Sequence, residues 1–179
     1  MEDYDNVYGS AEDHTIGFVE SFSMAANSPA VARAMALTKQ ALEELNFTVV
    51  TFDLEDEMKK FFGPYMAGTA HGSLYKGVVN EMLDAGEASL FGLPKSERPP
   101  DEKWEAIMKE RYRLTHEFSK KWQEAGISAL ITPVSPVAPA TMKHMGKIGI
   151  KYLLKSLGLW SMHGYPAGVM PVTEVQEDE

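Results

Sequence analysis

The chain has 179 residues, of which 44% are hydrophobic and 24% charged, proportions typical of a soluble globular protein with a sizeable core. It carries 17 Lys and Arg residues against 26 Asp and Glu residues, and the resulting net charge of -9 would repel phosphate backbones, so nucleic acid is not an expected partner. The chain has no cysteine, which excludes a disulfide framework, a thiolate nucleophile and a thiolate-bound zinc ion.

Both ends of the sequence are acidic. The start, MEDYDNVYGSAEDH, has no apolar core and does not read as a secretory signal, so residues 1–13 are expected to be disordered. Residues 176–179 are expected to form an acidic tail. No apolar run approaches the length needed to span a bilayer, and a cytoplasmic location is expected.

The first half predicts a strand, a helix and a second strand. HTIGFVE at 14–20 and FTVVTF at 47–52 have the β-branched and aromatic content of strands. Residues 27–46 between them predict a helix, with Asn27 or Ser28 as its cap and a proline in the first turn. Such crossovers join parallel strands. The expected apolar stripe of this helix is Val31, Met35, Leu42 and Leu45.

The middle of the chain is mostly helical in pattern. Residues 55–83 predict helix interrupted by GP at 63–64 and by GTAHGS at 68–73, and 84–102 predict a loop. A long helix is expected from about 101 to 125, stopped by Gly126. Its apolar stripe is Trp104, Ile107, Met108, Leu114, Phe118 and Trp122.

A third strand, 127–131, leads into a loop with prolines at 133, 136 and 139 and only small or apolar residues between them. This loop is either a rigid neutral wall at the carboxyl end of a strand, where open α/β sheets place ligands, or a surface connection stiffened by proline. A helix at 146–164 and a strand at 167–172 follow. With no internal repeat, the order predicts an α/β fold with a partial, mixed but mainly parallel sheet flanked by helices.

Motifs for catalysis and for cofactor binding are absent from the sequence. It has no GxSxG segment, no GxGxxG or GxxxxGK phosphate loop, and no HExxH or similar spacing among its five histidines. A pairing of Ser135 or Ser161 with His163 is conceivable, but serines that bond to nearby backbone are the favoured interpretation. No metal and no cofactor are therefore expected.

Three stretches resemble a known family when they are taken together. They are GFVESFSMAANSPAVARAMALTKQALEELNFTVVTF at 17–52, ALITPVSPVAPA at 129–140 and YPAGVMPVTEV at 165–175. In this order they are similar to the carboxyl-terminal half of amidase signature hydrolases, in particular the fatty-acid amide hydrolases. The resemblance implies a partial amidase-like domain over 14–175, with a mixed-sheet α/β/α core that lacks its catalytic half.

The resemblance also implies hydrolysis of fatty-acid amides or esters by a serine nucleophile, a second serine and a lysine base. Those catalytic residues belong to a GGSSGG-like segment and its surroundings, and nothing in this sequence matches them. No catalytic residue is carried over. The resemblance does place seven residues along the acyl channel: Met24, Phe61, Phe62, Thr69, Ala70, Leu154 and Gly158. Core packing is the alternative role for each of them.

One departure from the family concerns membranes. The mammalian-type enzymes of that family carry two strongly apolar helices that dip into the membrane, and the corresponding place here, DAGEASLFGLPKSERPPDE, is short and charged, which argues against monotopic membrane binding. A peripheral association with internal membranes, as in relatives, stays the alternative to a purely cytoplasmic location. Three functions stay open: an inactive fragment of an amidase, a non-catalytic lipid-binding or regulatory protein, and an autonomous hydrolase with a new nucleophile. The expected partners are a fatty-acyl amide or other lipid, a second copy of the chain, or a full-length amidase, because a cut sheet exposes an edge.

Overall fold

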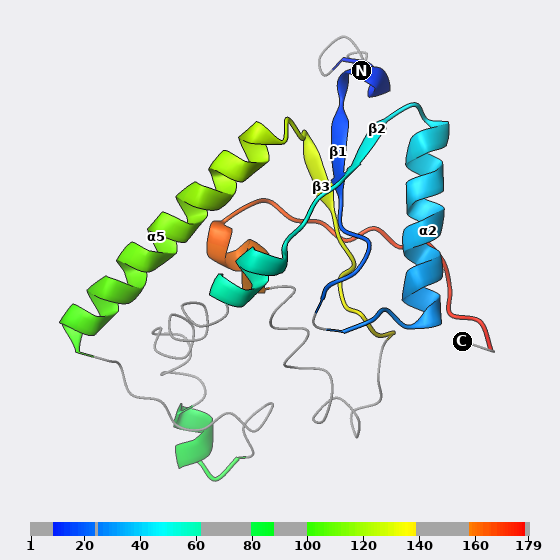
Figure 1. The fold of residues 1–179 in the computed structure, drawn as a ribbon. Coiled ribbons are helices and arrows are strands. Elements are labelled where there is room, and N and C mark those ends of the chain that lie inside the picture. The colour runs from blue at the N-terminus through cyan, green and yellow to red at the C-terminus, as the bar shows by residue number, and fades with distance from the viewer. Residues whose placement is uncertain (1–8, 24, 62–79, 88–99, 139–157, 178–179) are drawn as a thin grey trace, which may run out of the picture. The chain divides into compact units, whose positions relative to one another are not determined.

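The computed structural model describes residues 9–23, 25–61, 80–87, 100–138 and 158–177 (Figure 1). The chain forms two compact units. Unit 1 consists of Met1–Glu55, Ser119–Pro139 and Gly168–Glu179, and unit 2 consists of Asp56–Phe118 and Ala140–Ala167.

The centre of unit 1 is a parallel sheet of three strands in the order β2-β1-β3 (Figure 1). Strand β1 (Thr15–Phe18) pairs on one side with β2 (Thr48–Thr51) and on the other with β3 (Ala129–Ile131), both parallel. Gly17 lies opposite Val50 in β2 and Leu130 in β3. The predicted α/β class with a parallel sheet is confirmed.

The central strand is the most buried of the three. Ile16 and Phe18 are buried, whereas β2 and β3 are half-buried or exposed. A Cβ atom added at Gly17 would meet the Cδ1 atoms of Ile127 and Leu130 at 2.8 Å each. Glycine therefore allows the side chains around β3 to close over β1.

Helix α2 (Pro29–Glu44) connects β1 to β2 and contacts β2, as the strand–helix–strand pattern predicts (Figure 1). Its buried face holds Met35 and Thr38. The predicted stripe is wrong at Leu45, which is the C-cap residue and is 62% exposed. The helix ends there because Asn46 adopts a left-handed conformation with φ of 64°.

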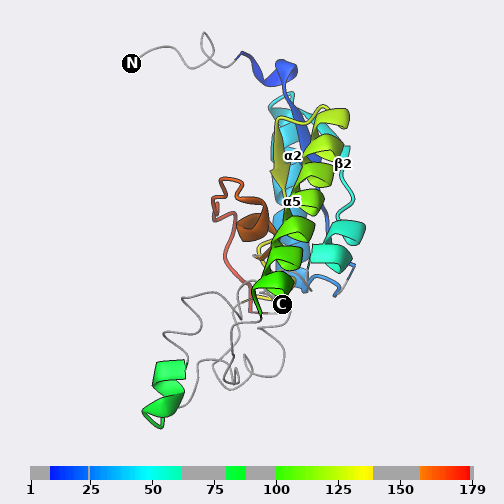
Figure 2. The same ribbon diagram turned by 90° about the vertical axis from the view of Figure 1, so that its left-hand side faces the viewer.

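Helix α5 (Asp101–Glu124) is a single long helix, as predicted (Figure 2). Leu114 and Phe118, both members of the predicted stripe, are its buried residues. Exposed ion pairs such as Arg113 with Glu117 cover its polar face. Gly126, with φ of 61°, ends the helix, which confirms the predicted stop.

The remaining helical segments that the structure describes are short: 55–61, 80–84 and 158–163, with a 3-10 helix at Ala11–Asp13. The last of these lies at the end of the segment expected to be disordered, and the Ser10 hydroxyl and backbone N–H both donate to Asp13. Within the described ranges, no helix combines the length and apolarity that crossing a membrane requires.

The strand predicted at 167–172 is wrong. This segment has no strand in the structure and is exposed, with Val169 at 72% and Met170 at 67%. Its continuation is held by Arg33 of α2, whose guanidinium donates to the hydroxyl of Thr173 and to the carbonyl of Glu174 at 2.8 and 2.7 Å. Apolar β-branched composition predicts a strand, but a strand forms only where a partner strand is in register, and none of β1–β3 pairs with it.

Candidate functional site

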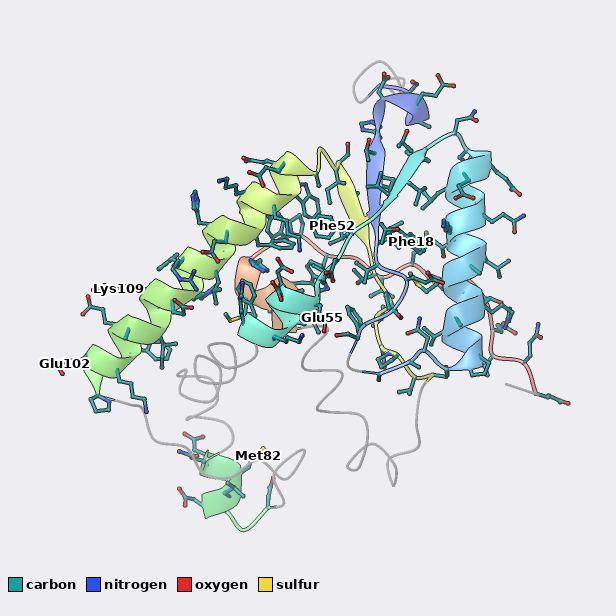
Figure 3. The ribbon with its side chains drawn as sticks, viewed as in Figure 1. Phe18, Phe52, Glu55, Met82, Glu102 and Lys109 are labelled. Atoms are coloured by element: carbon teal, nitrogen blue, oxygen red, sulfur yellow. The ribbon has the colours of Figure 1, made fainter. Side chains whose placement is uncertain are left out.

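The carboxyl edge of the sheet in unit 1 is the first candidate site. Because β1 lies between β2 and β3, the chain leaves β1 toward one neighbour and later reaches the other, so the strand order reverses beside β1. Open α/β sheets bind ligands at the carboxyl ends of the strands at such a point. Figure 3 shows Phe18 and Phe52, both buried, at the carboxyl ends of β1 and β2.

Two parts of the chain lie at this edge between β1 and β3: residues 19–23 with 25–28, and the proline loop, 132–138. They are joined by backbone hydrogen bonds, from the N–H of Val19 to the carbonyl of Ile131 at 2.9 Å and from the N–H of Ser28 to the carbonyl of Pro136 at 2.7 Å. Pro133 and Pro136 are buried, and no residue from 132 to 138 is charged. The part of the proline loop that the structure describes is therefore uncharged and combines two buried prolines with an exposed Val134 (44%), and the choice between the two interpretations stays open.

Two polar atoms at this edge are buried without a hydrogen-bond partner, the Oδ1 atom of Asn27 and the Oγ atom of Ser28. The Asn27 amide nitrogen donates to the carbonyl of Glu20 at 2.8 Å. Ser28 is the N-cap of α2, as predicted, yet its hydroxyl makes no capping bond. Buried groups of this kind are normally satisfied, so the two oxygens mark a place where a water molecule or a ligand donor would be stabilised.

No nucleophile is activated at this edge within the described residues. The Ser135 hydroxyl accepts a hydrogen bond from the backbone N–H of Val137 at 3.3 Å, which confirms the expectation of a locally bonded serine. The imagined pair of Ser161 with His163 does not form, because neither ring nitrogen of His163 has a hydrogen-bond partner.

A serine–histidine contact that the sequence did not reveal lies at the opposite edge. The Nδ1 atom of His14 is 3.1 Å from the Oγ atom of Ser128, within reach of the contact that activates a serine. His14 precedes β1 and Ser128 precedes β3, so the pair lies at the amino edge of the parallel sheet. No sequence motif links two residues so far apart, and only the strand register brings them together.

The second candidate site is a buried aromatic cluster in unit 2, centred on His163. The ring of His163 stacks on Phe118 with centroids 4.3 Å apart and meets the edge of Phe61 at 4.1 Å. Tyr165 lies at 5.9 Å. Trp160 adds an edge contact to Phe118 at 6.3 Å. The pKa of His163 is lowered to about 4, first by burial and second by the positive charge of Arg111.

Two of the seven predicted channel residues, Phe61 and Gly158, lie among the described residues of unit 2. Phe61 is buried against His163, and Gly158 is buried at the start of the helical segment 158–163 that carries the histidine. The other five, Met24, Phe62, Thr69, Ala70 and Leu154, lie outside the described residues.

The described parts of the chain contain no group of three His, Cys, Asp or Glu side chains that would hold a metal ion. Both candidate sites are instead apolar, with a few polar atoms at fixed places.

Comparison with known proteins gives one result. The amidase family model matches residues 2–179, which is nearly the whole chain. No curated protein and no solved structure matches. The ordered resemblance of the three stretches, the parallel α/β sheet and the family match agree, and this chain belongs to the amidase family.

Proposed function

We propose that the chain is part of an amidase-type hydrolase of fatty-acid amides or esters. In this proposal it supplies a wall of the acyl channel, another segment of protein supplies the serine nucleophile and the lysine base, and the chain is inactive alone. The observation that carries the proposal is the burial of Phe61 against His163 in an aromatic cluster of unit 2.

The chemistry of the cluster supports an acyl ligand. Its members are aromatic or small, and aromatic walls with few polar atoms are typical of sites for apolar ligands. Its imidazole is held neutral by burial. A neutral wall favours an uncharged amide or ester over a charged substrate, because a charged group placed there would lose its hydration.

The proposal places catalysis elsewhere because the chain contains no serine–serine–lysine signature. At the carboxyl edge, the Ser135 hydroxyl accepts a hydrogen bond from the backbone N–H of Val137, the local role expected of a structural serine. In this proposal the chain is cytoplasmic, and its partner is a second copy of the chain or a full-length amidase. Of these two partners, only a full-length amidase would contribute the catalytic residues, because a second copy of the chain lacks them as well.

A non-catalytic lipid-binding protein is a second candidate. It is favoured because the chain lacks the serine–serine–lysine signature although the family model matches residues 2–179. The two candidates differ in one respect. Adding the chain to a full-length amidase would raise amide hydrolysis if the chain completes a channel, and would lower it if the chain only sequesters the lipid.

Inactivity is tested by incubating the purified chain with a fluorophosphonate probe and, separately, with a long-chain fatty-acid amide. We expect no covalent labelling and no release of fatty acid. The contact of His14 with Ser128 makes this a demanding test, because that pair is the one described arrangement with activation geometry. Labelling that disappears in Ser128→Ala but persists in Ser135→Ala would overturn the assignment and identify an autonomous hydrolase.

A further inference from the structure

His163 occupies an unusual place for an ionisable side chain. It is only 9% exposed. Phe118 covers one face of its ring at 4.3 Å, and Phe61 and Tyr165 surround it at 4.1 and 5.9 Å. These three residues come from α5, from the segment 55–61 and from the residues just after 158–163.

Neither ring nitrogen of His163 has a hydrogen-bond partner. A neutral imidazole has one N–H donor and one acceptor nitrogen, and both are unsatisfied here. An imidazolium would have two unsatisfied donors and a buried charge, which is far less favourable than the neutral ring.

The charged surroundings act in the same direction. Arg111 of α5 donates from its Nε atom to the carbonyl of Met162, beside His163, at 3.0 Å, and its positive charge opposes a second one on the imidazole. The segment 55–61 presents the ring of Phe61. Besides His163 itself, the cluster as the structure describes it contains one more titratable side chain, the phenol ring of Tyr165, which faces the imidazole. Within the described residues, no carboxylate acts on His163 to stabilise its protonated form.

We propose that His163 is an acid-sensitive switch in unit 2: protonation of its ring disrupts the aromatic cluster, so that unit 2 opens when the pH falls. The switch belongs to the fold itself and does not depend on the proposed hydrolase function. Its geometric basis is a histidine enclosed by three aromatic rings, with no carboxylate acting on it from the described residues.

The direction follows from proton linkage. The pKa of His163 is about 4 in the folded chain and about 6.5 in an unfolded one, so the unfolded state binds the proton more tightly. The stabilising effect of keeping His163 neutral is complete above pH 6.5 and is lost as the pH falls toward 4. When the pH falls from about 7.5 to about 5, protonation of this one histidine in the unfolded chain raises the unfolding equilibrium constant about 30-fold.

The test is urea unfolding of the full chain at those two pH values, followed by tryptophan fluorescence, for the wild type, His163→Phe and His116→Gln. His116 is an exposed histidine of the same helix α5 and serves as the matched control. We expect His163→Phe to lose most of the 30-fold factor, because phenylalanine fills the cluster without a titrating group, and His116→Gln to keep it. An unchanged pH dependence in His163→Phe would overturn the proposal.

A measurement on the wild type covers the case in which His163→Phe does not fold. NMR titration of the chain with labelled histidines follows each imidazole separately. We expect the imidazole of His163 to stay neutral down to pH 5. Its chemical shift should change only together with the loss of dispersed signals from unit 2. Titration near the ordinary histidine value in the folded chain would contradict the switch.

Discussion

The backbone N–H of Ser28 donates to the carbonyl of Pro136 at 2.7 Å, joining the start of helix α2 to the proline loop after β3. The two residues come from segments far apart in the sequence, and both segments begin at the carboxyl edge of the sheet. Because the side chain of Pro136 is fully buried, packing and hydrogen bonding fix the loop at the same point.

The substitution Pro136→Ala should therefore destabilise unit 1 by about 1–3 kcal/mol, through lost packing and greater freedom of the unfolded chain. The matched control is Pro166→Ala, which changes an exposed proline and should cost no more than about 1 kcal/mol. Chemical unfolding of both variants measures the difference. Equal losses would show that the proline loop is a surface connection and not a packed wall.

Gly17 should tolerate no side chain without a cost, because an added Cβ would lie 2.8 Å from Cδ1 atoms of Ile127 and Leu130. Gly17→Val should lower the free energy of unfolding by about 1–3 kcal/mol, and Gly17→Ala by less, since the two Cδ1 atoms are side-chain ends that can shift. At Gly168 an added Cβ meets nothing within 4 Å, so Gly168→Ala is the control and should be nearly neutral. A Gly17→Val variant as stable as Gly168→Ala would contradict the close approach of β1 and β3.

Phe118 is 1% exposed and touches His163, Trp160 and Tyr165. Its truncation to alanine should destabilise the chain by about 3–5 kcal/mol, because a large cavity would remain in unit 2. Tyr112, on the same helix and 68% exposed, should lose no more than about 0.5 kcal/mol in the corresponding Tyr112→Ala variant. Thermal unfolding of the pair gives the comparison, and similar losses would mean that unit 2 has no core around Phe118.

Arg33 holds the exposed segment after Gly168 through Thr173 and Glu174. In Arg33→Gln we expect faster amide exchange over residues 172–176, because the two hydrogen bonds from the guanidinium are lost. Arg113→Gln removes an exposed arginine that pairs within α5 and should leave that exchange unchanged. Hydrogen exchange with mass spectrometry resolves the segment. Unchanged exchange in Arg33→Gln would show that the segment is held by other contacts.

Elements with strong local signals were predictable from the sequence. β-Branched and aromatic residues identified β1 and β2, the serine–proline start identified α2, and Gly126 identified the end of α5. Leu45 continues the apolar spacing of α2, but it is the C-cap residue, and the left-handed backbone of Asn46 ends the helix there. The segment 167–172 was misassigned because strand formation depends on a partner that composition does not reveal.

The candidate sites were predictable only in part. The resemblance to amidases singled out Phe61 and Gly158; the structure packs Phe61 against His163 and buries Gly158, and their role in a channel stays a prediction. The contact of His14 with Ser128 depends on the register of β1 and β3, which the sequence does not specify. The burial of His163 depends on rings from three segments, so its lowered pKa has no local signal in the sequence.

The central claim is that unit 2 provides an acyl-channel wall, and photoaffinity labelling of the wild-type chain tests it most directly. The probe is a long-chain fatty-acid amide with a diazirine on its acyl chain, and the labelled peptides are identified by mass spectrometry with and without excess unlabelled amide. We predict competable labelling of peptides that contain Phe61 or Gly158 and no competition by acetamide. Labelling confined to the exposed segment around Val169 and Met170, or labelling that excess amide does not reduce, would contradict the claim.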